Sequence, residues 1–336
     1  MTKPRQLQLF TQFLPAGDHR FGNTLEFYDA IPKHVRSSNR VHSERVDGKY
    51  LPILEREFHF RHRTTGETRK YRVEIRPARL KLLGSPQGSK EREFYPSARE
   101  ELVEEALHKI AADTHCGVYL DNQAGVQFTL GQLRRELAAR NHSLPLAEIK
   151  QALEVCHNTN VRVMSDNGDE IAGSTIFPVL LVSSRAQWLD EPGDAYCYVQ
   201  FHPLLTKSIN ELTFRQFDYH THMQCTNQLA RWLHKRLSHN YVNANWSNAY
   251  TIKATTIIRD SCLINNDRFR DRLAAIEAAL GQLVSEQVVL GFSKEPIRSN
   301  RKLIDAKFHV TPSPQFVDDM KLANKRLSEQ RADSGE

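Results

Sequence analysis

The stretch from Ser97 to Arg185 constrains the fold of this chain most strongly, because it combines three helix signals with a hairpin signal. Ser97 and Glu100 form a capping box, Thr129 can cap a second helix, and Pro145 suits the first turn of a third. Each signal precedes an apolar stripe at helical spacing. The stripes are Leu102, Val103, Ala106, Leu107 and Ile110, then Leu130, Leu133 and Leu137, then Leu146, Ile149, Leu153 and Cys156.

A hairpin is expected after the third helix. Residues 161–164 alternate, 166–169 (Asp-Asn-Gly-Asp) turn, and 171–183 return as a strand, with Asn-Gly as the strongest short hairpin signal. With the short apolar piece at 126–128, the order is helix, strand, helix, helix, hairpin, which is the order of a winged helix-turn-helix. Such units also serve as inert scaffolds or dimerisation modules, so this order alone favours DNA binding only modestly.

The same order occurs a second time. The expected elements are a long helix over 214–239, a strand over 250–252, a helix over 253–264, a helix over 268–287 capped by 265–267, and a hairpin with strands at 288–292 and 303–310 and its tip at 293–302. We therefore predict an α+β fold with two tandem winged-helix domains preceded by a basic, strand-rich N-terminal region. The expected divisions are an arm (1–22), the strand-rich region (23–96), the first winged helix (97–185), the second winged helix (196–311) and a charged tail (312–336).

Charge and composition narrow the class of partner. The 336 residues, 40% of them apolar, suit two or three domains with real cores, and a net charge of +6 favours a polyanion. Region 36–92 carries fifteen Lys or Arg against seven acids, so phosphate contact is a hypothesis there and a solvated sheet face is its alternative. Five scattered Cys without a CxxC pair, a polar start and no long apolar run predict a cytoplasmic protein with no membrane span.

The second unit carries the better helix for reading DNA. A helix-turn-helix places the start of its last helix at the base edges, where arginine can pair with guanine or phosphate. That helix opens with Arg268, Arg270 and Arg272, offset from its apolar stripe. The hairpin tip carries four more cations that could reach a backbone or a minor groove: Lys294, Arg298, Arg301 and Lys302. The alternative is that these are surface charges paired with Asp267, Asp271 and Glu295.

The first unit offers a poorer face for a polyanion. Its last helix presents Lys150 and Gln151 as DNA-binding candidates, but Glu148 and Glu154 lie beside them. We therefore expect the first unit to be an auxiliary DNA binder, a dimerisation surface, or both.

Three segments resemble Rep-type initiators of iteron-containing bacterial plasmids. Residues 126–137 (VQFTLGQLRREL) resemble the first-domain strand and helix, 212–219 (LTFRQFDY) the opening of the long helix of the second domain, and 255–261 (TTIIRDS) a further part of broad-host-range Rep proteins. The resemblance covers about 97–311 and rests on architecture more than on one sharp motif. Region 36–92 has no match in it.

The resemblance implies a non-enzymatic initiator without a cofactor. Such a protein binds direct repeats in double-stranded origin DNA, helps to open an A+T-rich segment, and recruits the host replication initiator and helicase. It can form a homodimer, and its second domain makes the stronger repeat contact.

Three rival functions stay open. A winged-helix transcriptional regulator with a sensor domain would bind one palindrome, whereas an initiator would bind spaced direct repeats. An adaptor would bind a protein partner independently of salt. A rolling-circle nickase or relaxase needs a His-x-His metal pair, but His220 and His222 lie on a predicted helix, where positions i and i+2 point apart. His222 and Cys225 could share a metal, although a packed His is commoner, and no GxxxxGK[ST] or GxSxG motif is present. We predict no catalytic residue and no metal.

Overall fold

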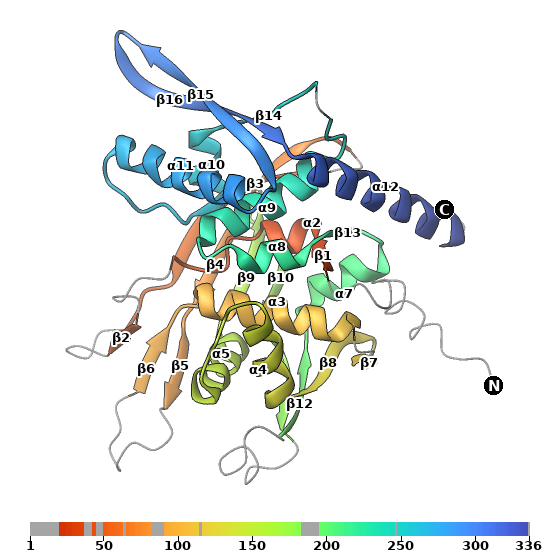
Figure 1. Cartoon of the computed structure of the whole chain (residues 1–336). Coiled ribbons are helices and arrows are strands. Elements are labelled where there is room, and N and C mark those ends of the chain that lie inside the picture. Colours follow the sequence, from red (N-terminus) through yellow and green to blue (C-terminus); the bar gives the residue numbers. More distant parts are fainter. Residues whose placement is uncertain are drawn as a thin grey trace. The chain divides into compact units, whose positions relative to one another are not determined.

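The computed structural model describes residues 20–36, 42–44, 50–62, 65–81, 91–113, 116–182, 195–245 and 247–334. The chain forms two compact units, whose elements are labelled in Figure 1. The first unit contains residues 31–210. The second unit combines residues 18–30 with residues 211–336, so its chain is discontinuous. Both units mix helices with antiparallel strands, as the α+β prediction requires.

The first unit contains helices and three antiparallel sheets. Its helices are α3 (Ala98–Asp113), α4 (Leu130–Ala139), α5 (Leu146–Asn158) and α7 (Pro203–Asn210). Its strands are β2 (His42–Glu44), β3 (Leu54–Arg61), β4 (Thr68–Arg76), β5 (Ala78–Lys81), β6 (Glu91–Phe94), β7 (Gly117–Leu120), β8 (Gln123–Thr129), β9 (Asn160–Ser165), β10 (Glu170–Thr175), β11 (Leu180–Val182) and β12 (Tyr196–Gln200). The sheet orders are β10-β9-β4-β3, β11-β12-β8-β7 and β2-β6-β5.

The predicted helix starts of the first unit are confirmed. The Ser97 N–H donates to Glu100 Oε2 at 2.8 Å, which is the return bond of a capping box. The Ser97 hydroxyl also donates to Glu100, rather than accepting from the helix as we expected. Thr129 Oγ1 accepts from the Gln132 N–H at 3.1 Å at the start of α4. Apart from Leu146, which is half-buried, the predicted stripe residues are buried.

The hairpin of the first unit is confirmed only in part. Gly168, at a φ of 87°, turns β9 into β10 as the Asn-Gly signal predicts. The single returning strand expected over 171–183 is wrong, because β10 ends at Thr175 and β11 belongs to another sheet. Pro178 cannot donate to a ladder, and the Phe177 N–H bonds to the Cys156 carbonyl at 3.3 Å.

Two strand pairings cross the boundaries that were expected between the regions of the chain. Strand β4, from the expected N-terminal region 23–96, pairs with β9 of the expected first winged helix. Strand β12, expected to start the second domain at residue 196, pairs instead with β8 of the first unit. Hydrogen-bonded ladders between distant segments therefore merge regions that looked separate in the sequence.

The second unit contains two smaller antiparallel sheets and six helices in its described part. Its strands are β1 (Phe21–Leu25), β13 (Phe214–Asp218), β14 (Tyr250–Lys253), β15 (Val289–Ser299) and β16 (Lys302–Pro312). Its helices are α2 (Glu26–Ala30), α8 (Tyr219–Gln224), α9 (Gln228–Asn240), α10 (Ala254–Ser261), α11 (Phe269–Ser285) and α12 (Pro314–Ser334). The sheet orders are β1-β13 and β14-β16-β15. The predicted order of a strand, two helices and a hairpin is therefore present from β14 to β16.

The long helix predicted over 214–239 is wrong. Residues 214–218 form β13, and two short helices follow it. Asp218 caps α8 by accepting from the Thr221 N–H at 2.9 Å, and Asn227 caps α9 by accepting from the Leu229 N–H at 2.9 Å. Two caps within ten residues start two helices where the apolar spacing suggested one.

The two ends of the second unit are also more ordered than we predicted. Of the expected arm, residues 1–19 lie outside the described residues, and Phe21 and Gly22 belong to β1. The expected tail over 312–336 is helix α12 up to Ser334, and its Phe316 and Met320 side chains are buried in the core of this unit. Their apolar spacing was present in the sequence, but the surrounding charges hid it.

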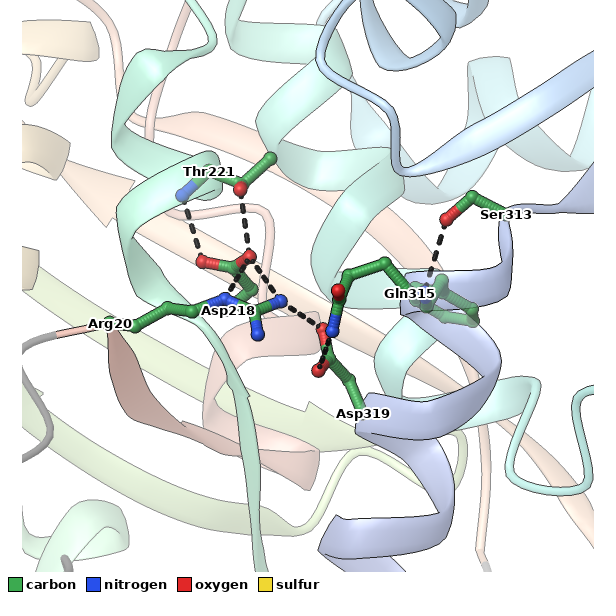
Figure 2. Close-up of polar contacts among 7 residues, drawn as sticks. Arg20, Asp218, Thr221, Ser313, Gln315 and Asp319 are labelled. Atoms are coloured by element: carbon green, nitrogen blue, oxygen red, sulfur yellow. Dashed lines mark hydrogen bonds and ion pairs between the residues drawn. The ribbon is translucent and has the colours of Figure 1, made fainter.

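A partly buried polar cluster connects these two ends (Figure 2). Arg20 Nη2 lies 2.9 Å from Asp218 Oδ2 and 2.6 Å from Asp319 Oδ2. Burial opposes ionisation of Asp218, but its bonds from Thr221 and the charge of Arg20 lower its pKa. Burial raises the pKa of Asp319, whose Oδ1 accepts from Gln315. Arg20 thus connects the N-terminal segment to the start of α8 and to α12.

We expect Gly125→Ala to destabilise the first unit by about 2 kcal/mol. A Cβ on Gly125 would lie 2.6 Å from Cε2 and from the hydroxyl oxygen of Tyr198. It would also lie 2.6 Å from the Val199 carbonyl oxygen, which belongs to the paired strand and cannot move freely. Gly281→Ala is the control, because a Cβ on this α11 residue meets no atom within 4 Å. Alanine there should stabilise the helix by about 0.5–1 kcal/mol. Urea unfolding of both variants measures the contrast, and equal stabilities would contradict it.

Candidate nucleic-acid interface

The start of α11 presents two arginines to solvent and uses a third to hold its own backbone. Arg268 and Arg270 are exposed, and neither has an ion-pair partner among the described residues. Arg272 is half-buried, and its Nε donates to the Asn266 carbonyl at 2.6 Å. The cap predicted over 265–267 is wrong, since the N-cap of α11 is Arg268 and it makes no side-chain cap bond. The three arginines therefore have different roles.

The solvent-facing side of α11 combines small side chains with charged ones, among them Asp271 and Glu277. Its opposite side was predicted to be Phe269, Leu273, Ile276, Leu280 and Leu283. All but the half-buried Phe269 are buried, and Ala279 is buried with them. Arg270, Ala274 and Ala278 are exposed at helical spacing of four residues, so they form one stripe. Small side chains behind a single arginine let the helix backbone approach a surface closely.

The hairpin β15–β16 is longer and tighter than predicted. Its ladder continues from Val289↔Pro312 to Ser299↔Lys302, so the loop expected over 293–302 reduces to Asn300 and Arg301. Both residues have positive φ, 46° and 67°, which is the requirement of a two-residue type I′ turn. Strands of eleven residues extend roughly 35 Å, and the hairpin projects away from α10 and α11 in Figure 1.

The cations of the hairpin separate into two groups. Arg298, Arg301 and Lys302 are exposed at the turn, and none of them forms an ion pair with another described residue. Arg298 Nη1 donates only to the Arg301 carbonyl, at 3.3 Å. Lys294 lies farther from the turn and forms an ion pair with Glu277 of α11, both partners being exposed. Lys294 therefore links hairpin and helix in addition to presenting charge.

The three acids that were candidates to neutralise these cations form no ion pair with them among the described residues. Glu295 lies 3.6 Å from Lys307 Nζ and 3.0 Å from His309 Nε2, on the hairpin itself. Asp267 and Asp271 make no ion pair within the described chain. The alternative in which the second-unit arginines are paired with these acids is thus contradicted for Arg268, Arg270, Arg298 and Arg301.

In the first unit, the two candidate residues make internal contacts. Gln151 Oε1 accepts from Arg99 Nη1 at 2.9 Å, which joins α5 to the start of α3. Lys150 is half-buried, and that burial lowers its pKa. Glu148 is exposed beside them. The first unit offers fewer free cations at this helix than the second unit does, and DNA contact by Lys150 and Gln151 stays a prediction.

Part of the charge of region 36–92 is paired where it is described. Glu57 lies 2.8 Å from Lys70, Arg79 lies 2.5 Å from Glu91, and Arg162 bridges Glu74 and Glu170 at 3.2 and 2.5 Å. The pairs of Lys70 and Arg79 fit the solvated sheet face that was the alternative, whereas Arg162 pairs with an acid of the region and leaves its excess of cations unchanged. Arg72 and Arg76 remain exposed on β4.

The His-x-His pair of the nickase alternative diverges. His220 is exposed, whereas His222 is buried with its ring 5.3 Å from that of Phe217. Within the described residues, no group of three His, Cys, Asp or Glu side chains is arranged to hold a metal. No helix of the described ranges is both long and apolar enough to cross a bilayer.

Sequence reasoning missed Asp305, an acid in an otherwise alternating strand. It is 8% exposed, and its carboxylate accepts from Thr255 at the start of α10. The strand pattern carried no signal for it, because β16 buries Ala306, Phe308 and Val310, and its period of two places residue 305 on the opposite face.

Comparison with known proteins gives structural relatives only. No model of a protein family and no curated protein matches the chain. Domains 2 and 3 of RctB resemble it with a TM-score of 0.47 and 10% identity, over 88% of this chain and 99% of that one. A selenomethionine form of the same domains gives 0.47 and 9%, over 85% and 97%. The Pi initiator protein, solved with iteron DNA, gives 0.44 and 12%, over 64% and 91%.

Proposed function

We propose that this chain is a non-enzymatic, Rep-type replication initiator that binds direct repeats in double-stranded DNA in the cytoplasm. The observation that carries the proposal lies in the second unit. Exposed arginines without carboxylate partners in the described chain occur both at the start of α11 and at the turn of β15–β16. Arginines that no carboxylate neutralises, at the start of one helix and at the turn of one hairpin, are suited to bind a polyanion.

The helix is the part that fits base readout. An α-helix fits the major groove of B-DNA, and arginine can contact guanine in two places at once. Arg270 begins a stripe that continues with Ala274 and Ala278, so α11 can lie deep in the groove without steric conflict. Alanine methyl groups can also contact the methyl group of thymine. We therefore assign sequence reading to α11.

The hairpin is the part that fits backbone contact. Arg298, Arg301 and Lys302 lie at a projecting turn, where they can approach phosphates or a minor groove beside the helix. On this basis we propose that β14, α10, α11, β15 and β16 form a winged helix-turn-helix. Helices α3, α4 and α5 with the β9–β10 hairpin would form a second one, used for auxiliary DNA contact or for a homodimer.

The steps after DNA binding rest on the Rep-type resemblance. In this proposal the bound protein promotes opening of the origin and recruits the host replication initiator and helicase. It needs no cofactor for these steps, because binding energy and protein contacts drive them.

A footprint on DNA flanking the gene for this chain, at two salt concentrations, tests the proposal. We expect protection of several evenly spaced direct repeats that weakens steeply as salt rises. One protected palindrome would favour a transcriptional regulator, because a two-fold symmetric dimer reads a symmetric site. No protection at low salt would contradict DNA binding.

Three arginine variants should separate base reading, backbone contact and structure. Arg270→Ala should weaken binding to the preferred site by about 1–3 kcal/mol and relax its specificity. Arg301→Ala should weaken binding to all sequences alike and lower the salt slope by about one. Arg272→Ala should act mainly through stability, because its guanidinium holds the Asn266 carbonyl. Affinity measured on specific and random duplexes distinguishes them, and unchanged affinity in both Arg270→Ala and Arg301→Ala would exclude this surface.

A further inference from the structure

Helix α10 is capped at its N-terminus by a side chain of the hairpin instead of by its own N-cap residue. Its N-cap residue, Lys253, makes no side-chain cap bond. The Thr255 N–H donates to Asp305 Oδ1 at 3.1 Å, and the Thr255 hydroxyl donates to Asp305 Oδ2 at 2.7 Å. Asp305 belongs to β16, fifty residues along the chain. A side chain of the hairpin therefore fills the place that a Ser, Thr, Asp or Asn usually takes at position 253.

The Asp305 carboxylate is buried, so it must keep its hydrogen bonds to Thr255 in a fixed geometry. Asp305 is 8% exposed, and it also accepts from the Ala306 N–H at 2.8 Å. A buried carboxylate is tolerated only where donors satisfy it. The free N–H groups and the positive end of the dipole of α10 provide that environment.

Asp305 also lies where the hairpin changes character. From Ala306 onward, alternate residues of β16, including Phe308 and Val310, are buried in the core of the unit. On the other side, residues 302–304 are exposed or half-buried and lead to the turn. The register shifts between Ile297 and Arg298, directly across from Asp305, which marks a bulge at this level. A bulge bends and twists a strand, so the direction of the turn is set here.

We propose that Asp305 is a positioning residue that fixes the projecting hairpin to the start of α10. Through it, the turn cations and α11 meet DNA as one surface of constant geometry. The proposal rests on the proposed DNA-binding function. The exposed Lys294–Glu277 pair is a second link, but it is screened by solvent and is expected to contribute less.

The experiment separates capping from positioning by restoring the cap in its ordinary place. Asp305→Ala removes both roles. Adding Lys253→Ser returns a capping side chain to α10, since residue 253 already has the extended backbone of an N-cap, φ −82° and ψ 146°. Lys253→Ser alone is the matched control for the lost charge. Full-length proteins are compared by thermal unfolding and by affinity for a 40-base-pair duplex, on the order of four helical turns, that the wild-type protein selects from a random pool.

The readout for positioning is the effect of Arg301→Ala in each background. In the wild type we expect Arg301→Ala to weaken binding about tenfold, in line with a lost phosphate contact. In Asp305→Ala/Lys253→Ser we expect unfolding to return to the level of the Lys253→Ser control, while Arg301→Ala then costs less than about threefold, because the turn no longer meets DNA in a fixed place.

A loss of about tenfold in both backgrounds would overturn the positioning role and leave the DNA-binding surface intact. No effect of Arg301→Ala in the wild type would overturn the surface itself. If Asp305→Ala/Lys253→Ser does not fold, Asp305→Leu/Lys253→Ser replaces it, since leucine fills the buried position but accepts no hydrogen bond from Thr255. The same comparison with Arg301→Ala then decides, and an unchanged tenfold loss would again contradict positioning.

Discussion

A fragment of residues 211–336 is expected to be largely unfolded, and a peptide of residues 18–30 is expected to restore its fold. The peptide provides β1, which pairs with β13 along its whole length, from Phe21↔Asp218 to Leu25↔Phe214. No other described strand pairs with β13. Removing the peptide therefore leaves the hydrogen-bonding edge of a buried strand empty, which is costly.

The apolar loss is as large as the stability of a typical domain. Phe21, Leu25 and Tyr28 are 5%, 1% and 1% exposed. At about 1.5–3 kcal/mol for each buried large side chain, they contribute roughly 5–9 kcal/mol. Domains are usually stable by only about 5–15 kcal/mol.

Polar contacts make the association specific. Lys235 Nζ lies 3.0 Å from Asp29 Oδ1, with both side chains nearly buried. Thr24 Oγ1 lies 2.7 Å from His239 Nε2, and Arg20 adds its bonds to Asp218 and Asp319. The 18–30 segment thus contacts three parts of the second unit that are distant in sequence.

Circular dichroism and urea unfolding of the fragment, with and without the peptide, measure this effect. A peptide carrying Leu25→Asp is the control, because it keeps the length and the turn signals but loses the buried side chain. Cooperative unfolding of residues 211–336 alone, unchanged by the native peptide, would contradict the prediction.

The same segment shows where sequence reasoning stopped. Local signals were predictive: Thr129 caps α4, Gly168 turns β9 into β10, and the apolar stripe of α11 is buried. The pairing of β1 with β13 joins residues almost two hundred positions apart, and no periodicity within either strand indicates its partner. Burial on both faces also removes the alternation that marks a strand, so Phe214–Asp218 was assigned to a helix.

In the candidate interface, too, the sequence predicted what depends on local structure and missed what depends on distant partners. Helix phase predicted that Arg270 faces outward, and the hairpin turn predicted the exposure of Arg301. The sequence could not predict that Arg272 bonds the Asn266 carbonyl, that Gln151 bonds Arg99, or that Asp305 caps α10. Each of those contacts depends on a partner that only folding brings near, so the neighbouring sequence does not indicate the contact.

Acid is expected to destabilise the first unit through His202. This side chain is 1% exposed, and its Nδ1 accepts from the Leu204 N–H at 3.2 Å at the start of α7. Burial, reinforced by the charge of Lys33 and partly offset by Glu104, lowers the pKa of His202 from 6.5 to about 4. Protonation would place a positive charge in a site shielded from water, and it would also remove the acceptor that the Leu204 N–H needs.

The sign of the pH dependence follows from which state binds the proton first. As pH falls below 6.5, the unfolded chain takes up a proton on residue 202 while the folded chain does not. Stability from this residue is therefore complete above pH 6.5 and is lost between 6.5 and about 4, by roughly 3 kcal/mol. Burial also lowers the pKa of His234, so the second unit loses stability in the same direction.

His202→Asn isolates the effect from the titration of carboxylates. Asparagine Oδ1 can accept from the Leu204 N–H in place of Nδ1, and it does not titrate in this range. Although burial opposes ionisation of Glu104, the charges of Lys33 and His34 hold its pKa well below its usual range, and this acid titrates in both proteins. Urea unfolding between pH 7 and pH 4, followed by a probe in the first unit, should show the stability of the wild type falling relative to that of the variant by up to roughly 3 kcal/mol, because only the wild type loses the His202 contribution. Parallel pH profiles for the two proteins would mean that His202 is protonated equally easily in the folded and unfolded states.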